Sequence, residues 1–471
     1  MPLQLFNTET RALQTVTPLD GKKVRFYTCG PTVYDFAHIG NFRTFIFEDI
    51  LRRAMKFFGY EVMQVMNLTD VDDKTIRGSV AKKMSLNDFT SQYTKAFFED
   101  IKTLNIEQVE HYPAATDYIP QMIEMIEELI RKGVAYVGKD GSVYFAIGKF
   151  PGYGKLSHLS LDELKVGASE GRRSQDEYGK ENIADFVLWK GYDPERDGEV
   201  YWESPFGKGR PGWHLECSVM ARAILGDTID IHAGGVDLMF PHHENEIAQS
   251  ESCTGCCFSK LWVHAEHLLV DNKKMSKSLG NFYTLRDLLE KGYSGKVIRY
   301  MLMQTHYRTS LNFTFQGLEG AKAAISRIND FIIRLEEYQG PLGVQFADIE
   351  SFTARAIEDF GKALADDLNV PEALAVLFEM IRAANGLCDA KKLSRHDAEA
   401  ILEVVKKMDS VLGVGTFTHE SVPAEVQKLV DERQHARAVR DWKRSDEIRD
   451  ALAGLGYVVE DTPSGSRVKR L

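Results

Sequence analysis

Residues 24–66 have the pattern of a strand, a glycine-containing turn, a helix and a second strand. Residues 24–29 form a short β-rich run that stops at Gly30, and apolar residues then recur at helical spacing within residues 38–59. Residues 61–66 are again β-rich. This order predicts a βαβ unit, in which the two strands are parallel. Ligands bind such sheets at the carboxyl ends of the strands, so we expect the functional residues there.

The rest of the chain divides into segments of different character. A Gly- and Asp-rich stretch at 113–205 has hairpin-like pieces and is typical of an insertion, and β-rich runs return at 229–235 and 261–264. From about 290 to 412 the pattern is helical, and a joint at 413–423 leads to a last basic helix. These changes predict an α/β domain with an insertion, an all-α region and a small C-terminal domain.

Composition excludes several classes of protein. The 471 residues are 44% hydrophobic and 27% charged, which is the mix of a soluble globular protein. No apolar run approaches the ~18–20 residues that span a bilayer. The N-terminus lacks a basic region followed by an apolar stretch, so we expect a cytoplasmic protein with no membrane partner. With 58 basic and 69 acidic residues the formal net charge is −11, which argues against coating DNA but permits a local nucleic-acid-binding face.

Two short motifs indicate phosphate chemistry. His38-Ile-Gly-Asn41 falls at a strand-to-helix turn, where an imidazole and backbone N–H groups at a helix N-terminus can bind phosphate. Lys274-Met-Ser-Lys277-Ser278 is a cationic loop that can stabilise charge on a leaving pyrophosphate. Each motif alone has a simpler interpretation, a structural turn in the first case and a solvated basic loop in the second.

Together the two motifs resemble the signature of the class I aminoacyl-tRNA synthetases, in which a HIGH-like box precedes a KMSKS box by more than 200 residues. Other stretches closely resemble the cysteinyl-tRNA synthetase family, and they are Asn67–Lys74, Asp185–Lys190, Gly209–Cys217 and Phe240–Ile247. The resemblance runs through most of the chain and is strongest over residues 1–315. It implies ATP-dependent activation of L-cysteine to cysteinyl-adenylate and transfer to tRNA(Cys), by a monomer that needs no DNA partner.

The resemblance also implies an architecture. We expect an α/β fold with a Rossmann-type class I synthetase catalytic domain and an inserted connective domain, followed by an all-α helical bundle and a small C-terminal anticodon-binding domain. The expected boundaries are 1–112 and 206–290 for the catalytic domain, 113–205 for the connective insertion, 291–320 for a stem-contact segment, 321–412 for the bundle and 413–471 for the anticodon-binding domain.

A catalytic zinc ion, one per chain, is implied as well. The residues that match the ligands of the family are Cys29, Cys217, His242 and Glu246. Pro241 suits a first helical position, so His242 and Glu246 share one face of a helix. The sequence alone leaves His242 or His243, and Glu244 or Glu246, as open choices that the resemblance decides. Zinc would separate cysteine from serine in one step, because a thiolate is a strong ligand and an alcohol is not, and no editing domain is then needed.

A rival metal site has suggestive spacing. Cys253, Cys256 and Cys257 are followed by His264 and His267, a pattern similar to a structural zinc knuckle. Exposed loop thiols are the simpler interpretation, and Cys388 in the helical region is most simply a core residue.

The resemblance assigns further site residues. The catalytic motifs supply His38, Gly40, Asn41, Lys274 and Lys277, with Mg²⁺ accompanying ATP. Asn41 replaces the second histidine of the HIGH box, and we expect weaker but not absent catalysis from it. Gly234, Gly235 and Asp237 resemble the segment that holds adenosine, although a tight turn after a strand explains them too. Thr69, Asp70 and Trp213 resemble residues of the amino-acid pocket, and core packing is the alternative for Trp213.

The last helix is expected to contact tRNA. From Val426 it carries Arg433, Arg437, Arg440 and Arg444, whose offsets place them on one face of a single helix. A solvated helix is the alternative, because acidic residues are interleaved. Two other functions stay open, namely a cysteine ligase of the mycothiol-biosynthesis type, which lacks an anticodon-binding end, and a catalytically silent paralogue that binds tRNA or zinc.

Overall fold

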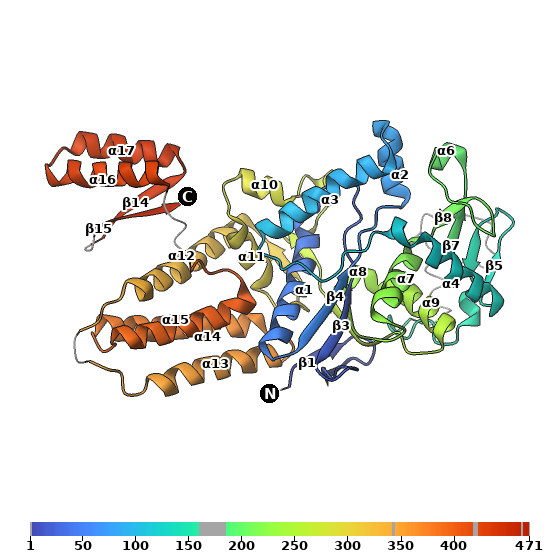
Figure 1. Cartoon of the computed structure of the whole chain (residues 1–471), viewed down its shortest axis with the longest axis horizontal. Coiled ribbons are helices and arrows are strands. Elements are labelled where there is room, and N and C mark those ends of the chain that lie inside the picture. Colours follow the sequence, from blue (N-terminus) through green and yellow to red (C-terminus); the bar gives the residue numbers. More distant parts are fainter. Residues whose placement is uncertain (1, 160–184, 342–343, 418–422, 463–464, 471) are drawn as a thin grey trace. The chain divides into compact units, whose positions relative to one another are not determined.

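The computed structural model describes residues 2–159, 185–341, 344–417, 423–462 and 465–470. The chain forms two compact units, one of Met1–Leu289 with Tyr293–Gly415 and the other of Glu290–Gly292 with Thr416–Leu471 (Figure 1). Part of the expected insertion, residues 160–184, lies outside the described residues.

A four-stranded parallel sheet forms the centre of the larger unit. Its strands are hydrogen-bonded in the order β10 (Ser259–Ala265), β9 (Ile229–Gly235), β3 (Lys23–Thr28), β4 (Glu61–Met66). Helix α1 (Ile39–Phe57) connects β3 to β4 and buries Phe42, Ile46 and Ile50 at helical spacing. The predicted βαβ unit and the two later strands are therefore confirmed. Because all the strands are parallel, the residues that follow them gather at one edge.

The segment between β4 and β9 adds helices and a second sheet. Its longer helices are α2 (Asp73–Lys82), α3 (Leu86–Thr103), α4 (Ile119–Arg131) and α7 (Trp213–Leu225), and its short helices are η1 (Ala115–Tyr118), η2 (Ile147–Lys149) and α6 (Pro194–Asp197). The antiparallel sheet has the order β5 (Ala135–Val137), β6 (Val143–Phe145), β7 (Phe186–Gly191), β8 (Gly209–Pro211). The insertion sheet therefore continues beyond residue 205, because β8 pairs with β7.

Shorter elements complete the α/β part of the larger unit. They are β1 (Gln4–Asn7), β2 (Ala12–Thr15), α8 (Val236–Leu238), η3 (Met239–His243), α9 (Glu244–Thr254), β11 (Leu268–Val270), β12 (Lys273–Lys274), η4 (Lys277–Leu279), α10 (Leu285–Glu290), α11 (Gly295–Met303) and β13 (Leu311–Phe313). Strand β13 pairs with β11 in a small sheet, within a region whose sequence pattern is almost all helical.

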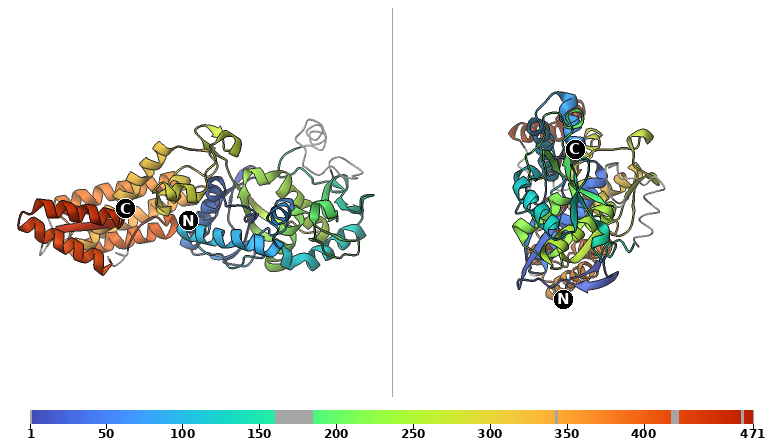
Figure 2. Two further views of the ribbon diagram at one scale, coloured as in Figure 1. Left: turned by 90° about the horizontal axis from the view of Figure 1, so that it is seen from above. Right: turned by 90° about the vertical axis from the view of Figure 1, so that its right-hand side faces the viewer.

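Four helices form the all-α region, and they are α12 (Phe315–Glu337), α13 (Ile349–Ala365), α14 (Val370–Asp389) and α15 (Arg395–Leu412). They lie alongside one another in both Figures 1 and 2, with α13 against α14 and α15. Arg299 on α11 joins this region to α1, because its fully buried guanidinium pairs with Asp49 and donates to the carbonyl of Leu412.

The smaller unit contains α16 (Ala424–Ala438), α17 (Trp442–Gly454) and a hairpin of β14 (Tyr457–Thr462) and β15 (Gly465–Arg470). Its core is formed by Val426, Val430, Ile448, Leu452 and Val459. The expected single basic helix is wrong, because the chain leaves the helix after Ala438 and Arg440 adopts a φ of 61° before α17 begins. None of the helices in the described part of the chain is long and apolar enough to cross a membrane.

Candidate active site

Four side chains of the kinds that bind zinc meet at the carboxyl edge of the parallel sheet. Cys29 follows β3, Cys217 lies on α7, and His242 and Glu246 lie where the chain enters α9. One donor atom from each lies within 4.8 Å of the others, and all four side chains are buried. Sγ of Cys29 is 4.0 Å from Sγ of Cys217 and 3.9 Å from Oε1 of Glu246. Nε2 of His242 lies 3.1 Å from the same carboxylate oxygen.

These separations suit a tetrahedral ion. Bonds of ~2.0–2.3 Å to zinc place neighbouring ligand atoms roughly 3.3–3.8 Å apart. Burial raises the pKa of Cys29 and of Glu246 well above their usual values, and it lowers the pKa of His242 well below its usual value. Burial thus disfavours the ionised forms of the thiol and the carboxyl group. A bound cation stabilises these ionised forms, because it offsets the negative charge of the thiolates and the carboxylate.

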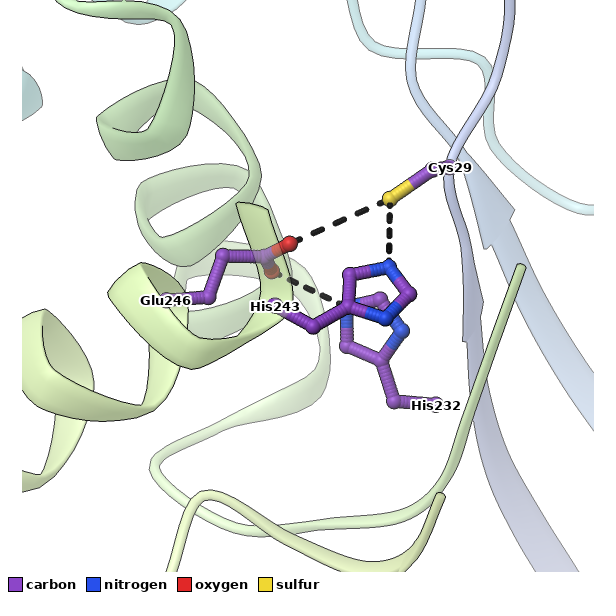
Figure 3. A group of neighbouring side chains, drawn as sticks. All are labelled: Cys29, His232, His243 and Glu246. Carbon is purple, nitrogen blue, oxygen red and sulfur yellow. Dashed lines mark hydrogen bonds and ion pairs between the residues drawn. The ribbon is translucent and has the colours of Figure 1, made fainter. Parts of the chain in front are cut away.

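A second set of donors shares two members with the first. Figure 3 shows Cys29, His232, His243 and Glu246, which also place one donor atom each within 4.8 Å of one another. Nε2 of His243 lies 3.4 Å from Sγ of Cys29, and Nε2 of His232 lies 2.9 Å from Oε2 of Glu246. Nδ1 of His243 in turn lies 2.8 Å from Nε2 of His264. This buried histidine group was not predicted from the sequence, although histidines are frequent in β9, β10 and the residues just before α9.

Glu244, the alternative to Glu246, points elsewhere. Its two carboxylate oxygens accept hydrogen bonds from the backbone N–H groups of Gly154 and Ser157, each at 2.8 Å. Glu244 therefore links the insertion to the start of α9 by hydrogen bonds, whereas the carboxylate of Glu246 contacts the thiol of Cys29. His242 belongs to the first set of donors and His243 to the second, so both histidines that the sequence left open lie in a candidate metal-binding group.

The rival Cys253–Cys257 cluster does not assemble a metal-binding group among the residues that the structure describes. Sγ of Cys253 lies 3.4 Å from Nη1 of Arg222, and the thiol of Cys257 donates to a backbone carbonyl. His264 belongs to the buried histidine group instead. Cys388 is buried on α14, as expected for a core residue.

Trp213 lies over the first set of donors. Its ring stacks on that of His242 with 4.3 Å between ring centroids, and 39% of the residue is exposed. Nδ1 of His242 is 2.9 Å from Nδ1 of His214, which leaves its Nε2 directed at Glu246. Trp213 is thus a partly exposed wall of this site and not a core residue.

The first signature motif forms the start of α1. The backbone N–H of Asn41 donates to Nδ1 of His38, and the N–H of His38 donates to Oδ1 of Asn41, both at 3.1 Å. Gly40 permits this arrangement, because a Cβ there would lie 2.9 Å from Nδ1 of His38. Burial lowers the pKa of His38, which favours the neutral imidazole, and because Nδ1 accepts the N–H of Asn41 the ring proton lies on Nε2.

The second motif lies against the first. The N–H of Ile39 at the start of α1 donates to the carbonyl of Tyr283, just beyond the cationic loop, at 3.0 Å. Nζ of Lys277 is 2.7 Å from Oδ2 of Asp35 and 5.1 Å from the centroid of the Phe282 ring. Lys274 is exposed at the end of β12. The structure brings the two motifs together, and Asp35 is a neighbour that the sequence analysis missed.

The glycines at the end of β9 allow close packing. A Cβ on Gly235 would collide with the carboxylate of Asp237, and one on Gly234 would lie 2.9 Å from Cε1 of His243. Asp237 is near enough to His38 to raise its pKa, in opposition to the larger effect of burial. The candidate adenosine residues therefore adjoin the candidate phosphate residue.

Thr69 and Asp70 have different surroundings. Oγ1 of Thr69 accepts a hydrogen bond from Nδ2 of Asn67 at 3.0 Å, and Oδ1 of Asn67 accepts the N–H of Gly30. The carboxylate of Asp70 accepts two hydrogen bonds from Thr116, one from its backbone N–H at 3.0 Å and one from its hydroxyl. Thr69 is therefore linked through Asn67 to Gly30, the residue after Cys29, whereas Asp70 contacts Thr116.

The four arginines of the C-terminal unit do not share a face. Arg433 is buried on α16, Arg440 lies in the turn, and Arg444 lies on α17 with Nη2 3.4 Å from Oε2 of Glu432. Arg437 lies over the ring of the exposed Trp442, with 5.6 Å from its guanidinium carbon to the ring centroid.

Three family models match the chain. The tRNA synthetases class I (C) catalytic domain matches residues 15–323, the DALR domain matches 359–417, and the cysteinyl-tRNA ligase anticodon binding domain matches 419–468. Among solved structures, methionyl-tRNA synthetase from Mycobacterium tuberculosis in complex with methionyl-adenylate superposes with a TM-score of 0.58 at 14% identity, covering 83% of this chain and 90% of that chain. A putative arginyl-tRNA synthetase from Campylobacter jejuni superposes with a TM-score of 0.55 at 14% identity, covering 83% and 92%. These two likenesses establish the fold.

Curated relatives are much closer in sequence. A cysteine–tRNA ligase from Protochlamydia amoebophila is 58% identical over 472 residues, covering 100% of this chain and 98% of the relative. A cysteine–tRNA ligase from Chlamydia caviae is 54% identical over 470 residues, again covering 100% and 98%. The chain therefore belongs to the cysteine–tRNA ligase family of class I aminoacyl-tRNA synthetases.

Proposed function

We propose that the chain attaches L-cysteine to tRNA(Cys) in two steps. The carboxylate of cysteine attacks the α-phosphorus of ATP, and pyrophosphate leaves as cysteinyl-adenylate forms. A ribose hydroxyl of the terminal adenosine of the tRNA then attacks the acyl carbon, and AMP leaves. Positioning and electrostatic stabilisation dominate such chemistry, and little proton transfer is required of side chains.

One observation carries this proposal. Donors suited to a thiol-selective metal lie at the same sheet edge as a histidine and a lysine loop suited to a triphosphate. The donors are Cys29, Cys217, His242 and Glu246, and the phosphate groups are His38 and Lys277. An enzyme that activates cysteine with ATP needs both kinds of site side by side.

We infer that Cys29, Cys217, His242 and Glu246 hold one zinc ion. When bound, zinc supplies a soft Lewis acid that prefers a thiolate to the hydroxyl of serine, a difference that size and hydrogen bonding alone separate by only ~1–3 kcal/mol. This set is favoured because it contains two thiols and because Trp213, which stacks on His242, is partly exposed, whereas the side chains around the second set are buried. His232 and His243 then act as outer hydrogen-bond partners that orient Glu246 and Cys29.

The nucleotide site is assigned from the two motifs. His38 donates from Nε2 to a phosphate oxygen, because its Nδ1 is occupied by the N–H of Asn41. Lys277 exchanges Asp35 for the phosphates of ATP, with Lys274 beside it, and Mg²⁺ accompanies the nucleotide. Asp237 binds ribose hydroxyls.

The acceptor is tRNA rather than a small amino sugar, in keeping with the anticodon-binding match of residues 419–468. We assign Arg437, Arg440 and Arg444 of the smaller unit to contact with tRNA phosphates, with Trp442 stacking on a base. Arg433 is buried and supports the fold of the unit. We further propose that the enzyme works as a monomer in the cytoplasm, as its family resemblance implies.

The test combines metal content with substrate selectivity. Pyrophosphate exchange into ATP is measured with cysteine or serine for the wild type, for Cys217→Ser and for the control Cys388→Ser. We expect the wild type and the control to bind zinc and to respond to cysteine alone. Cys217→Ser should lose its zinc and at least about 100-fold of its cysteine-dependent exchange. Full zinc content in Cys217→Ser would contradict the ligand assignment, and wild-type exchange with serine would contradict the proposed selectivity.

A further inference from the structure

An exposed ion pair joins the two signature motifs. Nζ of Lys277 lies 2.7 Å from Oδ2 of Asp35, and the two side chains are 68% and 37% exposed. Among the residues that the structure describes, Lys277 forms an ion pair with no other carboxylate. Ion pairs that are open to solvent contribute little to stability, because water and salt screen both charges. The pair therefore adds little to the fold, and an anionic ligand can break it at small cost.

The loop that carries Lys277 is closed by hydrogen bonds of its own. Oδ1 of Asn281 accepts the backbone N–H of Ser276 at 2.9 Å, and its Nδ2 donates to the carbonyl of Lys274 at 3.2 Å. Oγ of Ser276 accepts the N–H of Leu279 at 3.2 Å. Asp35 takes part in none of these hydrogen bonds. What Asp35 fixes is therefore the position of the Lys277 ammonium group.

The ion pair holds that ammonium group beside the candidate phosphate residue. Nζ of Lys277 lies 5.1 Å from the centroid of the Phe282 ring, and the same ring lies edge-on to the imidazole of His38 with 5.4 Å between centroids. In the proposed function, Lys277 and His38 both contact phosphate oxygens. A triphosphate carries several negative charges against the single charge of Asp35, so it can displace the carboxylate.

The carboxylate of Asp35 is oriented by its own loop. Its Oδ1 accepts the backbone N–H of Phe36 at 2.9 Å, which leaves Oδ2 to Lys277. Another cation near this loop is Arg286, whose guanidinium lies 4.8 Å from the centroid of the Phe36 ring. Nη2 of Arg286 already pairs with two carboxylates of α3, at 3.0 and 3.2 Å. The charge of Asp35 is therefore balanced by Lys277.

We propose that Asp35 is a positioning residue that competes with phosphates for Lys277. ATP takes Lys277 only by displacing Asp35, so the carboxylate lowers the affinity for ATP. When pyrophosphate leaves, Lys277 returns to Asp35, so the same competition lowers the affinity for pyrophosphate and favours its release. AMP lacks the two phosphoryl groups that leave as pyrophosphate, so its affinity does not depend on Asp35. The inference rests on the proposed function, because it requires Lys277 to contact those two groups of ATP.

The test measures the dissociation constants of ATP, pyrophosphate and AMP by calorimetry, with Mg²⁺ and without cysteine. The full-length, zinc-loaded protein is used. Asp35→Asn removes the charge but keeps an amide oxygen that can accept the N–H of Phe36. It should lower the constants for ATP and pyrophosphate about three- to fivefold, the range expected for an exposed ion pair, and change that for AMP less than about twofold.

Two further variants separate the ion pair from a general effect of charge. In the background of Lys277→Met, Asp35→Asn should change the constant for ATP less than about twofold, because the partner through which Asp35 acts is gone. The matched control is Asp227→Asn, since Asp227 forms another exposed pair, with Arg222, at 2.7 Å. This control should leave all three constants at their wild-type values.

Each outcome decides a separate claim. A higher or an unchanged constant for ATP in Asp35→Asn would overturn the competition for Lys277 and leave the nucleotide site intact. An equal decrease for AMP, or a decrease that persists without Lys277, would show that Asp35 acts through its charge alone and would also overturn the proposal. If the wild type bound neither ATP nor pyrophosphate, the proposed nucleotide site would be wrong and this inference with it.

Discussion

His38 and Asn41 cap the N-terminus of α1 reciprocally, each backbone N–H donating to the side chain of the other at 3.1 Å. The amide oxygen of Asn41 is therefore committed to the backbone of His38. We therefore expect Asn41 to affect catalysis through the orientation of the His38 imidazole. The Nδ1 atom of this ring is held as an acceptor, and its Nε2 is left to donate.

Replacing Asn41 with alanine should loosen this turn. We expect Asn41→Ala to cost about 1 kcal/mol of unfolding free energy, the usual value for a lost helix cap. Pyrophosphate exchange should fall by about tenfold, because a misplaced donor contacts the phosphates less well. Urea unfolding and the exchange assay measure the two effects.

The variant Asn41→Asp separates the effect of the helix cap on stability from the effect of charge on ATP binding. It retains an oxygen that accepts the N–H of His38, so its stability should match the wild type. It also adds a negative charge beside the phosphates, so the KM for ATP should rise. An equal loss of stability in both variants would show that the side-chain cap of Asn41 contributes nothing.

Local pattern was sufficient to predict the central fold. The β-rich runs of β3, β4, β9 and β10 are short, apolar and bounded by turn residues, and each was found where its pattern predicts. Parallel pairing then brings Cys29, at the end of β3, to the same edge as the residues that follow β9. The choice between Glu244 and Glu246 was not predictable from spacing, because it depends on hydrogen bonds from the insertion to Glu244.

The C-terminal arginines show where periodicity fails. Offsets of 4, 7 and 11 place residues on one face only if a single helix continues through all of them. The helix ends at Ala438 because Arg440 adopts a positive φ and Asp441 caps a new helix by accepting the N–H of Arg444. Neither Gly nor Pro marks this turn, so it could not be predicted from its residues.

The melting temperature after removal of the C-terminal unit should depend on the residue at which the chain is cut. Gly413–Gly415 pack on the larger unit, since Val414 is fully buried and the carbonyl of Gly415 accepts Nζ of Lys296 at 2.6 Å. Deleting residues 416–471 should preserve the melting temperature of the larger unit and pyrophosphate exchange, and abolish most tRNA charging. Deleting 413–471 should also lower the melting temperature, because those contacts are lost. Equal melting temperatures for the two truncations would contradict the role given to Gly413–Gly415.

Arg299 should be a major contributor to stability. Its fully buried guanidinium pairs with Asp49 and also donates to the carbonyls of Leu104, Asn105 and Leu412. We expect Arg299→Met to reduce the unfolding free energy by about 3 kcal/mol, because Asp49 and three carbonyls lose a buried partner. Denaturant titration measures the change, and Arg53→Met is the matched control, since Arg53 pairs with the same carboxylate from a more exposed position. A larger loss in Arg53→Met would contradict this ranking.

Asp100 should make the stability of the larger unit depend on pH. Burial raises its pKa to about 6, against the effect of Arg286, whose Nη2 lies 3.2 Å from Oδ1 of Asp100. The unfolded chain has the ordinary pKa of 3.8, so between these two values the folded state binds more protons. The stabilising contribution of Asp100 is therefore fully present below pH 3.8 and is lost as the pH rises through about 6.

Asp100→Asn removes this titration while keeping the shape of the side chain. We expect its unfolding free energy, relative to the wild type, to rise as the pH increases from 4 to 7. Arg286→Met should have the opposite effect on Asp100, because removing the guanidinium raises the pKa of the carboxyl group further and extends the loss of stability to higher pH. Denaturant titrations at several pH values measure both series. A difference between Asp100→Asn and the wild type that stays constant with pH would show that Asp100 titrates alike in the folded and unfolded chains.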